Sequence, residues 1–211
     1  IHIHGTDRNY AYGLNRSNLS FYLEHNVILK RFTLSAGFTA VKNTWNEMPF
    51  KIYPGVDVSY RIGQNWKVFA SYNMSLRMPS FTELYYSVDG HKADKYLKPE
   101  EMSAVEGGVR YVSEGITGTL SVYHHHGTNM IDWIIDTSLG EDAVWTSVNH
   151  AEINSTGFEA SLKFRFASLL PRQDVLRTLN VSYSYIDQSQ DKEPGVQSLY
   201  ALEYLRHKLV E

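Results

Sequence analysis

The histidine run "HHH" at residues 124–126 is the first place where the sequence could support chemistry. On a strand, His124 and His126 share a face, and two imidazoles on one face can bind a single metal ion. If the strand begins near Ile116, however, both side chains lie close to the level where an outward apolar band would end. We therefore expect this pair at the boundary between an apolar band and solvent, and the sequence predicts no metal site.

Acidic side chains supply two further possibilities. Asp136, Glu141 and Asp142 offer the carboxylate oxygens that calcium prefers, so calcium binding in an outer loop is kept as an option, although their spacing matches no cation-binding loop. His150, with Asp132 and Asp136, has the residue types of a hydrolase. Nothing in the sequence places a base within reach of an acid or a water, so no catalytic residue and no covalent cofactor is predicted.

These side chains depend for their positions on runs that alternate between apolar and polar residues. In "NWKVFASYNMSLRM", every second residue from Trp66 to Met78 is apolar, and most of the residues between are polar. The same period of two occurs around residues 17–27, 32–41, 51–61, 103–112, 116–126, 157–166 and 178–185. Alternation of this kind is typical of strands with one apolar face. We therefore expect an all-β chain of about ten antiparallel strands, with the first strand near residues 1–12.

The lengths of the links between the runs also alternate. Short links occur at residues 28–31, 62–65 and 113–115, with 168–176 a longer member of this set, and long links occur at residues 43–50, 79–99, 136–143 and 187–197. Membrane barrels have short turns at one end and long loops at the other, and their strands are longer than the five or six residues usual in soluble domains. A soluble antiparallel sandwich is the alternative. Strand length and link order favour a transmembrane β-barrel.

Composition excludes several other classes of protein. The 20 Lys and Arg residues against 23 Asp and Glu residues give a net charge of -3, which offers no basic field for nucleic acid. No apolar run approaches the roughly 18 residues of a membrane helix, and the absence of cysteine excludes disulfides. The chain begins at Ile1 without a Met and stops in "LEYLRHKLVE", so we interpret residues 1–211 as part of a larger barrel.

Two boxes carry a resemblance to a known family. "LRMPSFTELYY" (76–86) and "LKPEEMSAVEGG" (97–108) resemble the paired boxes of TonB-dependent outer-membrane receptors. Later segments resemble those of the same family in the same order: "MIDWI" (130–134), "VWTSVN" (144–149), "NSTGFEASL" (154–162) and "YLRHKL" (204–209). The resemblance covers most of residues 50–211.

The resemblance implies the whole protein and its location. It would be a 22-stranded barrel in the outer membrane of a Gram-negative bacterium, in contact with outer-membrane lipid. An N-terminal plug domain, absent from this sequence together with the final strands, would contact the TonB complex. The protein would take up a scarce, bulky nutrient without changing it covalently. A ten-stranded outer-membrane protease and a passive channel remain the alternatives from other functional classes.

The resemblance also suggests a ligand and its contacts. "MIDWI" and "VWTSVNHAEINSTGFE" most resemble the cobalamin receptor branch found in Bacteroidetes-like bacteria, so cobalamin is the leading ligand. Haem or a ferric siderophore is the alternative, because haem receptors carry a histidine between the two boxes, where His91 lies. We expect the loop 79–99 to help capture the ligand, with Tyr85, Tyr86 and His91 as contacts. Arg77 and Glu106 are predicted to be structural charges on the inner wall.

Overall fold

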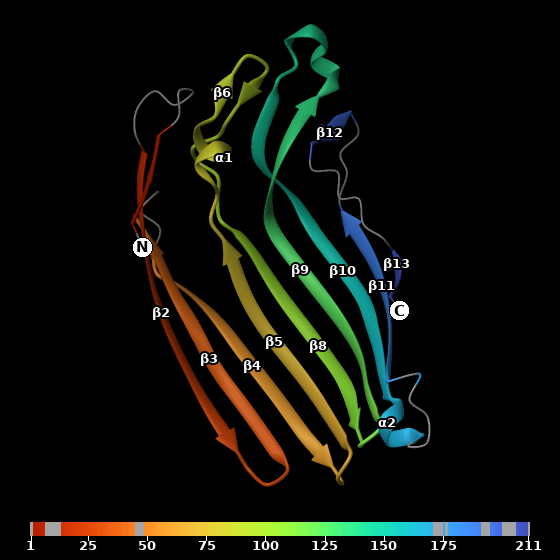
Figure 1. Ribbon diagram of the computed structural model, residues 1–211. Coiled ribbons are helices and arrows are strands. Elements are labelled where there is room, and N and C mark those ends of the chain that lie inside the picture. The colour runs from red at the N-terminus through yellow and green to blue at the C-terminus, as the bar shows by residue number, and fades with distance from the viewer. Residues whose placement is uncertain are drawn as a thin grey trace.

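The structure is a computed structural model that describes residues 2–6, 14–44, 49–170, 175, 177–190, 195–199 and 206–210. Within these residues ten strands follow one another, each antiparallel to the next, as a curved sheet (Figure 1). They are β1 (His2–Gly5), β2 (Leu14–Ile28), β3 (Phe32–Asn43), β4 (Lys51–Ile62), β5 (Trp66–Arg77), β8 (Glu100–Val112), β9 (Ile116–Asp136), β10 (Trp145–Arg165), β11 (Thr178–Gln190) and β13 (His207–Val210). The prediction of an all-β chain with about ten antiparallel strands is confirmed.

Shorter elements lie in the links. They are α1 (Phe81–Tyr85), β6 (Ser87–Val88), β7 (His91–Lys92), the 3-10 helix η2 (Thr137–Asp142), α2 (Phe166–Leu169) and β12 (Val196–Ser198). None of the described helices is long and apolar enough to cross a bilayer. Tight turns join β2 to β3, β4 to β5 and β8 to β9 at one end of the sheet, as the alternation of link lengths predicts.

The two faces of the sheet differ sharply in polarity. On one face, large apolar side chains stay exposed along the strands: Leu19, Phe21, Leu23, Ile52, Val56, Tyr60, Ile62, Trp66, Val68, Tyr72, Val105, Leu120, Val122 and Leu162. An exposed apolar surface that extends across so many strands is expected to contact lipid rather than water. We call this the apolar face, and in a membrane barrel it would be the outward face.

The opposite face carries the polar members of each alternation, and we call it the polar face. Glu106 lies in register with Ser71 on β5 and with Tyr123 on β9. Lys67 pairs in register with Arg110 in the same way. Because cross-strand partners point to the same side of a sheet, these residues share one wall. The register therefore places Glu106 on the polar face, and its role as a structural charge stays a prediction.

Two aromatic rings on the polar face lie over glycines of the neighbouring strand. Phe69 pairs with Gly108, where an added Cβ would lie 2.6 Å from the ring, and Tyr123 pairs with Gly157, where an added Cβ would lie 2.6 Å from the phenol oxygen. The missing side chain of each glycine therefore leaves room for the ring. Only glycine fits at these two positions without displacing a neighbour.

β9 and β10 extend far beyond the length needed to cross a membrane. Each has 21 residues, or about 70 Å of strand, whereas roughly ten residues cross the apolar band of a bilayer. The alternation around residues 116–126 covers only the lower part of β9, which continues to Asp136, where the predicted long link 136–143 begins. The upper part of this hairpin forms the highest part of the molecule in Figure 1.

Candidate functional site

Arg77, at the end of β5, joins two carboxylates at the loop end of the sheet. Its guanidinium donates to Glu100 through Nε at 2.5 Å and Nη2 at 2.6 Å, and to Glu83 at 3.1 and 3.0 Å. Paired bonds of this kind use the planar fork of arginine and are stronger than neutral hydrogen bonds. Glu100 also accepts from the Ile131 amide at 2.9 Å. We call Arg77, Glu83 and Glu100 the clamp. It joins the start of the loop 79–99 to its end.

A capping box starts α1 directly after Pro79. The Ser80 hydroxyl accepts from the Glu83 amide at 3.2 Å, and the Glu83 carboxylate accepts from the Ser80 amide at 2.6 Å. This reciprocal pair satisfies amides that a helix start would leave unpaired. Burial alone would raise the pKa of Glu83, but the bonds from Arg77 and Ser80 outweigh it and hold that pKa below its ordinary value. The side chain is thus kept charged where the clamp needs it.

Side chains of β10 fasten the loop to the long hairpin. Ser147 donates to the Glu83 carbonyl at 2.7 Å and accepts from the Asp94 amide at 2.7 Å. Asn149 accepts from the Lys98 amide at 2.6 Å and donates to the Lys98 carbonyl at 3.0 Å. β7 adds a short parallel pairing with β10. The loop is therefore a folded cap on the hairpin.

A small apolar core and an aromatic cluster fill the space beneath the cap. Leu84, Leu97 and Ile131 are almost completely buried and pack together, with Tyr85 against them. The Tyr86 ring lies 5.9 Å from His91 and 6.4 Å from the buried Trp133 in edge contacts. His91 lies 5.7 Å from Trp133, and its Nδ1 is buried without a hydrogen-bond partner among the described residues.

The structure gives the predicted loop contacts a role in packing. Tyr85 lies against the apolar core, and Tyr86 and His91 belong to the aromatic cluster with Trp133. Their role as ligand contacts stays a prediction. Arg77 lies at the top of β5 in the clamp, and Glu106 lies lower on the polar face.

Sequence reasoning missed the residues that hold the loop in place. Glu83, Glu100, Ser147 and Asn149 supply the clamp and the fastening bonds, and only the spacing of Ser80 and Glu83 carries a local signal, as a capping box.

The surface of the cap was also missed. Tyr96 is 67% exposed, with the Lys95 ammonium 5.0 Å from its ring. Lys92, Lys95 and Lys98 are all exposed within the same stretch of loop. The run "HKADKYLK" was the available sequence signal for this basic and aromatic surface.

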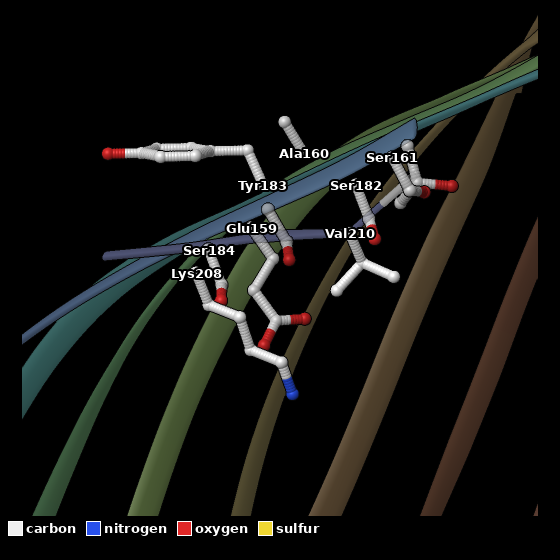
Figure 2. Close-up of a pocket in the computed structure, with 10 residues that line it drawn as sticks. Glu159, Ala160, Ser161, Ser182, Tyr183, Ser184, Lys208 and Val210 are labelled. Carbon is white, nitrogen blue, oxygen red and sulfur yellow. The ribbon is translucent and has the colours of Figure 1, made fainter. Parts of the chain in front are cut away.

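A shallow hollow of about 210 Å³ lies on the polar face where β9, β10, β11 and β13 adjoin. In Figure 2 the side chains of Glu159, Ser184 and Lys208 project from one side of the sheet, and Tyr183 and Ala160 project from the other. Small hydroxyl side chains form its floor: Thr119, Ser121, Ser161, Ser182 and Ser184. Hydroxyls both donate and accept, so this wall can form hydrogen bonds with a polar partner inside the barrel.

The acidic residues considered for chemistry have structural partners. Asp136 caps η2 by accepting from the Ser138 amide at 2.9 Å and from its hydroxyl at 2.6 Å. Asp132 is buried and accepts from the Ser198 hydroxyl. The side chain of His150 lies outside the described part of the chain. Calcium binding near Asp136, Glu141 and Asp142 stays a prediction.

Comparison with known proteins gives one family match and several structural matches. A family model described as "TonB dependent receptor-like, beta-barrel" matches residues 3–202. The siderophore receptor PirA from Pseudomonas aeruginosa superposes with a TM-score of 0.71 at 16% identity, over 86% of this chain and 34% of that one. The FrpB iron transporter from Neisseria meningitidis gives a TM-score of 0.64 at 19% identity, over 85% and 27%.

A third solved structure agrees with these two. A mutant of the ferric enterobactin receptor PfeA from Pseudomonas aeruginosa gives a TM-score of 0.66 at 16% identity, over 82% of this chain and 27% of that one. At such identities the likeness concerns the fold alone. The chain spans about a third or less of each of these proteins.

Proposed function

This chain belongs to the TonB-dependent receptor β-barrel family, and on that premise we propose that it forms part of an outer-membrane receptor for energised uptake of a scarce, bulky nutrient. The match over residues 3–202 carries the proposal. The continuous apolar face supports contact with outer-membrane lipid, and the polar face supports a wet lumen. Members of this family are transporters and not enzymes, so the protease and the passive channel are set aside.

The receptor would work with the TonB complex of a Gram-negative bacterium. In this proposal a plug domain, N-terminal to the barrel, fills the lumen and receives energy from TonB. The hydroxyl-rich hollow around Ser182 and Ser184 supports such a filled lumen, because it presents donors and acceptors to a polar surface.

The cap formed by residues 79–99 is proposed to help capture the ligand. The clamp holds its base, while Tyr96 and the exposed Lys92, Lys95 and Lys98 cover its outer surface. Exposed cations attract an anionic ligand and raise its association rate. Tyr85, Tyr86 and His91 would contribute from below, through small movements of the aromatic cluster.

Two ligands have separate support. Cobalamin comes first because of the resemblance of residues 130–134 and 144–159 to the cobalamin branch. A ferric siderophore comes second because the lysines of the cap suit a polyanionic chelate and because two structural matches are described as the siderophore receptor PirA and the ferric enterobactin receptor PfeA. Haem is the further alternative, with His91 as its proposed contact.

Ligand binding to the full-length receptor tests these proposals directly. Cyanocobalamin, ferric enterobactin and haem would be titrated in parallel against the purified receptor in detergent, at low and high salt. The triple variant Lys92→Gln, Lys95→Gln, Lys98→Gln removes the basic surface, and Lys30→Gln, in a turn at the far end of the sheet, is the matched control.

Each ligand predicts a different outcome. Ferric enterobactin should bind more weakly at high salt and several-fold more weakly to the triple variant, whereas cyanocobalamin, with no net charge, should be insensitive to both changes. Haem binding that is lost with His91→Ala would favour the third ligand. A loss of calcium dependence in Asp136→Asn would place calcium in the outer loop. Binding of none of the three would overturn the ligand proposals and leave the family assignment.

A further inference from the structure

His124 and His126 form a matched pair on β9. Both lie on the apolar side of the sheet, because they are in register with Thr156 and Asn154 of β10 in the same rows as Val122 with Phe158. His126 Nδ1 donates to the Asn154 Oδ1 at 2.8 Å, and His124 Nδ1 is hydrogen-bonded to the Thr156 Oγ1 at 2.8 Å. Neighbouring β10 therefore fixes both rings through the same ring nitrogen.

This arrangement leaves the other nitrogen of each ring available. An imidazole that donates from Nδ1 keeps a lone pair on Nε2, and an amide oxygen can only accept, so the tautomer of His126 is set by Asn154. Histidines that bind metals characteristically donate their second ring N–H to an oxygen of the protein. The sequence alone predicts no metal site here, because the partners on β10 lie about thirty residues away.

The same arrangement occurs a second time, on β1. His2 and His4 lie in register with Ser17 and Asn15 of β2. Their Nδ1 atoms are hydrogen-bonded to the Ser17 Oγ and the Asn15 Oδ1, each at 2.7 Å. In both places a His-x-His pair thus has one hydroxyl partner and one asparagine partner on the adjacent strand. A common arrangement on two strands far apart in the sequence argues for a common role.

The position on β9 is open to an ion from outside. Below the pair, the outward residues of β9 are Leu120 and Val122, which are exposed on the apolar face. At His124 and His126 this face becomes polar, together with Thr156 and Asn154. The pair therefore lies at the upper limit of the apolar band, where the barrel wall leaves the hydrocarbon.

We propose that His124 and His126 form a binding site for a divalent cation of the Cu²⁺, Ni²⁺ and Zn²⁺ class, and that His2 and His4 form a second copy. Imidazole suits these ions, and Cu²⁺ should bind most tightly among them. The described residues contain no group of three or more potential ligands that could hold a metal, so each site supplies two imidazoles and water completes the coordination. The proposal does not depend on the nutrient that the receptor carries.

Copper titration of the full-length receptor, purified without a histidine tag, tests the site. Binding of Cu²⁺ would be followed by calorimetry and by electron paramagnetic resonance, which detects nitrogen atoms bound to the ion. The double variant His124→Asn, His126→Asn should lose one equivalent of Cu²⁺ and its nitrogen signal. His125→Asn is the control, since His125 points to the polar face and stacks on Tyr123 at 4.8 Å.

Further variants test whether copper binding needs the oriented histidine pair or only an exposed histidine. Asn154→Ala removes the partner of His126 and should weaken Cu²⁺ binding about tenfold, the lower end of such effects, while heat-modifiable migration of the barrel is unchanged. His2→Asn with His4→Asn should remove a second equivalent. An unchanged copper stoichiometry in the β9 double variant, or an equal loss in His125→Asn, would overturn the proposal.

Discussion

The turn end and the loop end of this sheet are built by different means. At the turn end, β2 to β5 and β8 to β11 pair residue by residue and present an apolar face on one side. At the loop end, the cap of residues 79–99 is held by a few specific side chains, above all Arg77, Glu83 and Glu100. The first region depends mainly on the alternation of apolar and polar residues, with glycine required at a few positions such as Gly108 and Gly157, whereas the second depends on individual side-chain contacts.

The boundary between the two regions is visible in the strands themselves. β4 and β5 pair only as far as Gly55 and Asn73, and Pro54, which has no N–H to donate, is the next residue of β4. Beyond this point Lys51 and Tyr53 bond to Glu101 of β8 at 2.6 and 2.8 Å. Here side-chain bonds to β8 begin where the backbone pairing of β4 with β5 ends.

Replacing the arginine of the clamp should show the largest difference between the two regions, because it should destabilise the cap at the loop end and leave the turn end unchanged. Arg77→Ala leaves two largely buried carboxylates without their cation, and we expect a loss of about 2–4 kcal/mol in the stability of the cap. This is less than the loss for a fully buried pair, because the Arg77 side chain is 48% exposed and solvent screens its charge. Hydrogen exchange should increase in residues 79–99 and stay unchanged in β2 and β3.

Arg110→Ala is the control for this change, since Arg110 lies on the polar face and has no ion pair within the described residues. Equal exchange in Arg77→Ala and the wild-type receptor would show that the clamp does not hold the cap.

A change at Gly157 should impair the paired strands rather than the cap. In Gly157→Ala the new Cβ would lie 2.3 Å from the Tyr185 carbonyl oxygen and 2.6 Å from the Tyr123 hydroxyl, so we expect a loss of roughly 1–3 kcal/mol from overpacking. Barrel assembly should suffer, measured as the fraction of receptor with heat-modifiable migration. In Gly107→Ala the nearest atom lies at 3.8 Å, and assembly should be normal. Equal assembly of the two variants would contradict this account.

Loss of the helix cap should affect the cap region alone and more weakly. Ser80→Ala removes the hydroxyl that accepts from the Glu83 amide, which typically costs about 1 kcal/mol. Limited proteolysis should then cleave residues 79–99 a few times faster at unchanged barrel migration. Ser80→Asp, which retains an acceptor at the same position, should restore the wild-type rate. Failure of this rescue would exclude the capping bond as the cause.

Lowering the pH should destabilise the cap, and we expect this effect to be smaller than that of each substitution above. The pKa of Glu83 is lower in the folded protein than its ordinary value of 4.5, so its charge stabilises the fold above that value and this contribution is lost as the pH falls below it. Opening of the cap, measured as hydrogen exchange relative to the intrinsic exchange rate at each pH, should therefore increase below about pH 4.5 and not between pH 7 and 5. Glu83→Gln should lack this acid-dependent increase, and an identical pH profile would refute the assignment to Glu83.

The period-two pattern was sufficient to predict the turn end from the sequence. Residues 66–77 alternate between apolar and polar because one face of the strand meets lipid and the other meets water. The type of each residue therefore indicates the face on which it lies. The upper part of β9 could not be predicted in this way. Ile131, Asp132 and Trp133 are consecutive and all buried, because both faces of the strand contact protein there, and the alternation disappears.

The site could be predicted only where its contacts are local. The capping box of Ser80 and Glu83 lies within one turn of helix and can be recognised from the sequence. The bond from Ser147 to the Glu83 carbonyl joins residues 64 positions apart, and it exists only because the long hairpin brings β10 beside the loop. The same holds for the asparagine and threonine of β10 that orient His124 and His126.

The clamp has a consequence for the length of the loop. Arg77, Glu83 and Glu100 fix the two ends of the loop against each other, so the distance that the intervening chain must span does not depend on its length. Lengthening a loop whose ends are already fixed costs little, because the entropy of closure grows only with the logarithm of its length. An insertion in the turn between β6 and β7 should therefore cost little stability, because neither fixed end of the loop would have to move.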